Sequence, residues 1–148
     1  MSTRRRSFLV LLLALAAVPS VSLAQRTPPT PAPLHWEMVV DRATYDVVDL
    51  DPPVLPAAPG RLAVHYAWQE NDKIEQWWEQ VVSGNREPKN VILFVKRGTS
   101  KAKKTLISYA LDGVRLTAFK GPALSRTGGY DGPSTAVFSF TDVRVLPH

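Results

Sequence analysis

Cysteine is absent from the 148-residue chain, and this absence excludes several kinds of chemistry and of stabilisation. Without a thiol the chain has no thiolate nucleophile, no thiolate metal ligand and no disulfide bond. The folded state must therefore be stabilised by a hydrophobic core, which a chain of this length is able to build.

Recognisable catalytic patterns are also scarce. The three histidines are scattered as His35, His65 and His148, without the spacing of a paired metal site, and no Gly-x-Ser-x-Gly elbow occurs. His65 falls on the polar face of an expected strand, which favours an ordinary surface histidine. An enzyme would need an Asp/Glu pair brought together from separate strands. We therefore predict a protein that is not an enzyme and that needs no cofactor.

Two short segments resemble ligand sites but lack an essential part of each. Asp46, Asp49 and Asp51 could hold a hard cation, yet the glycine and the distal Glu of a calcium loop are missing, so a solvated turn is favoured. The glycine-rich Gly128–Gly132 precedes an expected strand, whereas a phosphate cradle leads into a helix. We predict no metal site and a flexible loop.

The N-terminal residues 1–24 have the pattern of a secretory signal peptide. A basic start with three arginines is followed by the apolar run Phe8–Ala17 and by the small-residue cleavage pattern Ser22–Ala24. The apolar run is about half of the roughly 20 residues that a membrane-spanning helix needs. A cleaved leader is thus preferred to an uncleaved anchor, and we predict export to the periplasm or the extracellular space.

The same segment bears on the export route and on the net charge of the mature protein. Arg5–Leu9 resembles a twin-arginine signal, but the Leu-rich run also suits the ordinary secretory route, and both stay open. Removing three arginines with the leader leaves 15 basic and 13 acidic residues, a net charge of +2. This balance predicts no general affinity for nucleic acid. Once the leader is cleaved, we also expect no stable membrane insertion.

The rest of the chain divides into a proline-rich linker, residues 25–33, and a single domain, residues 34–148. Alternating or continuous apolar runs predict strands. The proline-rich Asp51–Gly60 cannot be a central strand and is expected to be a surface connection. Asp112-Gly113 marks a turn or bulge. The seven expected strands are His35–Asp41, Thr44–Asp49, Arg61–Trp68, Asn90–Val95, Thr105–Leu111, Val114–Lys120 and Ser134–Val145.

One segment has the pattern of an amphipathic helix. Asp72 is an N-cap with Glu75 three residues later, and Gly84 supplies the stop. Both tryptophans lie inside its apolar stripe, which favours core packing over a ligand-stacking platform, although the flank position of Trp77 allows partial exposure. The stripe follows the i, i+3, i+4, i+7, i+8 spacing and comprises Ile74, Trp77, Trp78, Val81 and Val82.

Seven strands and one helix, with turns every 8–12 residues, predict a mainly β protein. The expected architecture is a small antiparallel β-barrel or two-sheet sandwich with one short α-helix packed against it. Within it, the hairpin tip is basic and could contact an acidic partner or anionic lipid headgroups. Alternatively, its charges only keep a hairpin end soluble and block edge pairing. The five residues of this basic tip are Lys96, Arg97, Lys101, Lys103 and Lys104.

A family resemblance covers residues 61–146. Four segments carry it, in a fixed order along the chain. They are the helix and strand of Ile74–Gly98, the junction Leu111-Asp112-Gly113-Val114, the pair Gly121-Pro122 and the last strand Ser134–Val145. This order resembles the core of phage tail-tube proteins and of the haemolysin-coregulated protein (Hcp), the tube subunit of type VI secretion.

The resemblance implies a barrel of two packed sheets flanked by one helix, which assembles into hexameric rings that stack into a tube. It implies no catalysis and no cofactor, and partners that are proteins, with copies of the same chain among the candidates. Two features depart from the family: the leader, and the replacement of its long extended hairpin by Asp51–Gly60.

Two function hypotheses therefore stand. The first is an exported, non-enzymatic structural protein with the tail-tube fold. The second is a periplasmic or surface module that binds a glycan or small ligand through exposed stacking residues, for which Trp36, Trp68 and Tyr130 are the candidates.

Overall fold

The computed structural model describes residues 28–99 and 101–147, and the predicted signal peptide lies outside them. No helix in this part of the chain has the length and apolar character to cross a membrane. The elements, in chain order, are β1 Leu34–Val40, β2 Ala43–Asp51, β3 Gly60–Tyr66, α1 Lys73–Val82, β4 Lys89–Thr99, β5 Ala102–Lys120, β6 Ala123–Leu124, β7 Tyr130–Asp131, β8 Ser134–Phe140 and β9 Asp142–Leu146.

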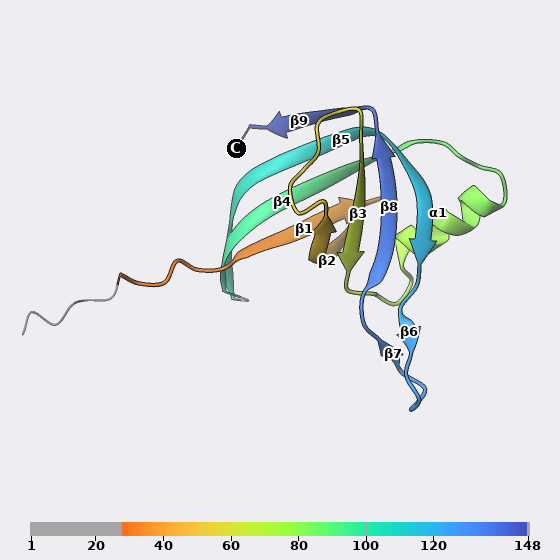
Figure 1. The fold of residues 1–148 in the computed structure, drawn as a ribbon, viewed down its shortest axis with the longest axis horizontal. Helices are drawn as coiled ribbons and strands as arrows, with labels where there is room; N and C mark the ends of the chain where they lie inside the picture. The colour runs from red at the N-terminus through yellow and green to blue at the C-terminus, as the bar shows by residue number, and fades with distance from the viewer. Residues whose placement is uncertain (1–27, 100, 148) are drawn as a thin grey trace, which may run out of the picture. The chain divides into compact units, whose positions relative to one another are not determined.

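Six of the strands close into an antiparallel barrel (Figure 1). Their order around the barrel is β1, β2, β3, β8, β5 and β4, and β4 pairs with β1 to complete the circle. Closure satisfies the backbone hydrogen bonds of both edges of these strands. The predicted mainly β fold with one short helix is confirmed, and of the two predicted architectures the barrel is the one observed.

Alternation of apolar side chains builds the interior of the barrel. On β3, Leu62, Val64 and Tyr66 are fully buried, and the next strand in space, β8, buries Ala136 and Phe138 in the same way. The neighbouring strand β5 contributes Leu116 directly opposite Phe138. Because each fully buried Leu, Val or Phe side chain stabilises the fold by about 1.5–3 kcal/mol, these cross-strand rows supply the driving force for closure.

The strand β5 changes neighbours at a glycine bulge. Its first part pairs with β4 and β9, and its last part, residues 115–120, pairs with β8. At the bulge, Gly113 has φ +61°, and a Cβ there would lie 2.4 Å from the Thr141 hydroxyl. The Thr141 amide donates to the Asp112 carbonyl at 3.0 Å. Of the predicted turn or bulge at Asp112-Gly113, the structure therefore has the bulge, and two expected strands become one.

The helix α1 lies beside the last part of β5 and contacts this strand (Figure 1). Asp72 caps it as predicted, accepting the backbone N–H of Ile74 at 2.8 Å and of Glu75 at 3.4 Å. The Glu75 carboxylate accepts the Trp68 indole N–H instead of reaching back to the cap, so only half of the capping box forms. Gly84, with φ +104°, ends the helix as predicted.

The buried face of α1 is rotated relative to its apolar stripe. Trp77 is only 1% exposed and stacks on Phe138, with ring centroids 5.8 Å apart. Trp78 is half-buried, and Val82 is 69% exposed. The prediction that Trp77 is the flank residue with partial exposure is therefore wrong. The reason is that the barrel covers one side of the stripe, where the Lys89 ammonium also lies over the Trp77 ring, and leaves the other side open.

Four features differ from the sequence prediction. The expected last strand Ser134–Val145 is two strands, β8 and β9, which Thr141 separates. β3 ends at Tyr66, so Trp68 lies in the connection to α1 and not on the strand. The turn between β1 and β2 is Asp41-Arg42, both with positive φ, one residue before the expected Arg42-Ala43. The glycine-rich loop 121–133 contains the small hairpin β6–β7. Such offsets arise because turn geometry depends on strand register, which distant contacts set.

Candidate functional site

The basic tip is partly neutralised in the folded chain. The Lys96 ammonium lies 2.6 Å from a Glu37 carboxylate oxygen, and Lys103 lies 3.7 Å from Asp46. The other three cations form no ion pair with any described residue; they are Arg97, Lys101 and Lys104. Strand register places Arg97 directly opposite Lys104, which leaves two like charges side by side on the hairpin. A contact between this tip and an acidic partner stays a prediction.

Beside this tip, the mouth of the barrel presents apolar side chains. Register places Trp36 and Ile107 in one row across β1, β4 and β5, and Tyr109 and Val145 in the next row. The Trp36 and Tyr109 rings stack with centroids 6.3 Å apart and are half-buried. Val145 is 68% exposed, and Leu34 and Ile107 are also exposed. The interior face of the barrel is thus partly open to solvent at this mouth.

This open mouth coincides with a free strand edge. Within the described ranges, β9 pairs with β5 alone, whereas every other strand of the main sheet has at least two neighbours. An unpaired edge presents backbone N–H and C=O groups to any further strand that approaches. The β9 edge and the apolar mouth together form a candidate contact surface, and we name this combination the β9 surface.

The three aromatic residues of the ligand-binding hypothesis do not converge. Trp68 and Tyr130 lie together, with ring centroids 4.5 Å apart, and Tyr130 is 59% exposed on the hairpin β6–β7. Trp36 instead stacks on Tyr109 at the barrel mouth. The structure therefore brings two of the three candidates together and places the third in a separate cluster.

The candidate polar residues have ordinary structural partners. The His65 ring nitrogen Nδ1 lies 2.8 Å from the Thr135 hydroxyl on the neighbouring strand. Asp49 accepts the backbone N–H of Leu50, and Asp46 faces Lys103. Across residues 28–99 and 101–147, no group of three or more acidic or histidine side chains is placed to hold a metal ion. None of these side chains assembles with another into a recognisable site.

The best-organised polar cluster lies at the N-terminus of α1. The buried Asp72 carboxylate accepts hydrogen bonds from the Tyr45 hydroxyl at 3.1 Å and the Tyr66 hydroxyl at 2.9 Å, besides the two helix N–H groups that it caps. The Tyr45 hydroxyl in turn accepts the Lys73 N–H at 2.8 Å. Burial and the nearby Asp72 charge raise the pKa of Tyr45 to about 12 and raise the pKa of Tyr66 as well. This cluster joins β2, β3 and α1.

The raised tyrosine pKa values predict a loss of stability in alkali. Between pH 10 and 12 the unfolded chain releases the phenolic protons while the folded chain keeps them, so the free energy of unfolding falls as pH rises. The stabilisation that the two protonated tyrosines provide is complete below pH 10 and disappears as the pH rises through their folded-state pKa values. The expected slope is about 1.4 kcal/mol per pH unit for each tyrosine, measurable by urea unfolding at several pH values. Tyr45→Phe should make the slope shallower; an unchanged slope would contradict the assignment.

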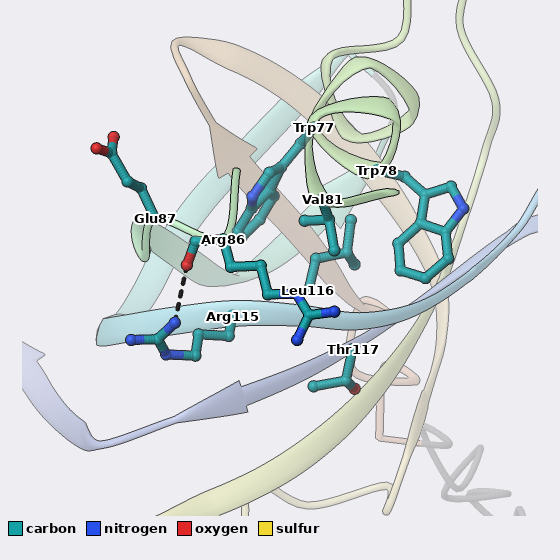
Figure 2. Close-up of a pocket in the computed structure, with 8 residues that line it drawn as sticks. All are labelled: Trp77, Trp78, Val81, Arg86, Glu87, Arg115, Leu116 and Thr117. Atoms are coloured by element: carbon teal, nitrogen blue, oxygen red, sulfur yellow. Dashed lines mark hydrogen bonds between the residues drawn. The ribbon is translucent and has the colours of Figure 1, made fainter. Parts of the chain in front are cut away.

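A groove lies between α1 and the last part of β5 (Figure 2), with a volume of about 390 Å³. Its apolar part is formed by Trp77, Val81 and the buried Leu116. Trp78 also lines the groove. Two arginines and Thr117 add polar atoms. The Arg115 guanidinium donates from Nη1 to the Arg86 carbonyl at 2.8 Å, which ties β5 to the loop that follows the helix. Sequence reasoning did not find this groove.

The comparisons with known proteins identify the fold. No protein-family model matches the chain, and no curated protein sequence matches it significantly. Among solved structures, the chain is similar to that of Hcp1 from Flavobacterium johnsoniae, with a TM-score of 0.52 and 14% sequence identity. The match covers 75% of this chain and 94% of that protein. The chain therefore has an Hcp-like fold, as the resemblance of residues 61–146 predicted.

Proposed function

We propose that this protein is an exported, non-enzymatic structural protein that self-associates through the β9 surface into an Hcp-like ring or tube. The shared fold with Hcp1 supports the structural role. The leader pattern of residues 1–24 supports export to the periplasm or the extracellular space. Self-association then involves further copies of this chain, and assembly needs no cofactor.

The observation that carries the proposal is the free edge of β9 beside exposed apolar side chains. A strand edge of this kind pairs with another strand unless charge, proline or a covering segment blocks it. Val145 and Ile107 would lose contact with water when a second copy covers the barrel mouth. A ring forms only if the β9 surface meets a different surface of the next copy, because such a contact can repeat by rotation until it closes, whereas β9 paired with β9 would stop at a dimer.

Self-association is tested on the full chain, expressed with its leader and recovered as the exported protein. We expect an oligomer in size-exclusion chromatography with light scattering. Val145→Lys should shift it to monomer, because a lysine on the covered apolar mouth would bury an unpaired charge.

The matched control is Val82→Lys, since Val82 has nearly the same exposure, 69% against 68%, but lies on α1. This variant should keep the size of the natural protein. A natural protein that stays monomeric at the highest attainable concentration would end the proposal of rings. If the two lysine substitutions changed the oligomer equally, β9 would not be part of the interface.

A further inference from the structure

The groove between α1 and β5 has an apolar interior and a cationic rim. Leu116 at its floor is buried, and Val81 and the edge of Trp77 lie beside it, so a ligand body placed there would contact carbon atoms. Its volume of about 390 Å³ lies within the range of small-molecule sites, which is roughly 300–1,000 Å³. The half-buried Trp78 provides a flat wall at one side.

The two arginines at the rim are available for an anion. Neither Arg86 nor Arg115 forms an ion pair with any residue in the described part of the chain. Glu87 also lines the groove, but Figure 2 shows its carboxylate pointing away from the Arg86 guanidinium. The hydrogen bond from Arg115 to the Arg86 carbonyl uses one donor and leaves the other N–H groups of that guanidinium unassigned.

We propose that this groove binds a small monocarboxylate with an aliphatic or aromatic body. The body would occupy the space between Trp78, Val81 and Leu116, and the carboxylate would meet the Arg86 guanidinium, which Figure 2 shows near Leu116 and Thr117. A guanidinium presents two parallel N–H groups that match the two oxygens of a carboxylate. A monoanion suits the site better than a dianion, because the apolar walls make each additional charge costly to desolvate.

This site is independent of the proposed self-association, which uses the barrel mouth and β9. The two proposals therefore fail separately: loss of ligand binding would leave the oligomer untouched, and a monomeric protein could still bind the ligand.

The test uses octanoate and octylamine, which contain the same number of carbon atoms in an unbranched chain and carry opposite charges, titrated into the full chain by calorimetry and by tryptophan fluorescence. We expect octanoate to bind and octylamine to bind at least tenfold more weakly. Arg86→Met should weaken octanoate binding by about tenfold to a hundredfold, the usual effect of removing a charge-assisted hydrogen bond. Arg115→Met should weaken it less, because Figure 2 shows that guanidinium turned towards the Arg86 carbonyl.

The matched control is Arg126→Met, which removes an exposed arginine of the glycine-rich loop and should leave the affinity unchanged. Trp78→Phe should abolish most of the fluorescence change while octanoate still binds in calorimetry, which would place the ligand at the groove. Absence of octanoate binding, equal binding of the two probes, or an Arg86 variant that binds like the natural protein would each overturn the proposal.

Discussion

Replacing Asp72 with alanine should lower the free energy of unfolding by about 3–5 kcal/mol, because one carboxylate serves four donors in the buried junction of β2, β3 and α1. Loss of the helix cap alone costs about 1 kcal/mol. The hydroxyls of Tyr45 and Tyr66 would also lose their acceptor inside the protein, at about 1–3 kcal/mol each. A single domain is stable by only about 5–15 kcal/mol, so this loss is a large part of the total.

Urea unfolding followed by tryptophan fluorescence measures this change. Asp72→Asn keeps an oxygen for the cap and similar size, so it should cost clearly less than the alanine variant. Asp131→Ala is the matched control for the same substitution at an exposed position and should change stability by less than about 0.5 kcal/mol. If Asp72→Ala unfolds within about 1 kcal/mol of the natural protein, the junction does not depend on this carboxylate.

Replacing Trp77 with alanine should cost about 3–5 kcal/mol, whereas the same change at the adjacent Trp78 should cost only about 1–2 kcal/mol. Trp77 is 1% exposed and stacks on Phe138 inside the barrel. Its removal leaves a cavity that the surrounding strands cannot close. Trp78 is half-buried at the groove, where water can replace the lost side chain.

Both alanine variants are compared by thermal and urea unfolding. If Trp77→Ala does not accumulate as a folded protein, Trp77→Phe keeps most of the ring and should cost less than the alanine variant while still exceeding the cost of Trp78→Phe. Equal losses at the two positions, or a larger loss at Trp78, would contradict the orientation of α1 in this structure.

Local sequence patterns predicted those features of the fold that neighbouring residues determine by themselves. Residue types predicted the cap at Asp72 and the stop at Gly84, and they marked a turn or bulge at Asp112-Gly113 without deciding between the two. The alternation of Leu62, Val64 and Tyr66 predicted the buried face of β3 in the same way. The fold class follows from the number and order of such elements, whereas the Hcp-like fold was implied by the family resemblance of residues 61–146.

The apolar stripe of α1, by contrast, did not reveal which tryptophan is buried. Periodicity places Trp77 and Trp78 on one broad face, but only the barrel determines which part of that face is covered. Likewise, the sequence places five charges at the basic tip, and only the sheet register brings Glu37 to Lys96. Pairings across dozens of residues have no local signal.

What the sequence by itself determined is thus the mainly β fold class, the single helix with its cap and stop, and the buried face of β3, because backbone propensity and alternation act over a few residues. What only the tertiary structure decided is the closure of the barrel, the free edge of β9, and the groove that joins Arg86 to Arg115. The physical reason is that these features are made by residues far apart in the chain, whose proximity depends on the complete strand register.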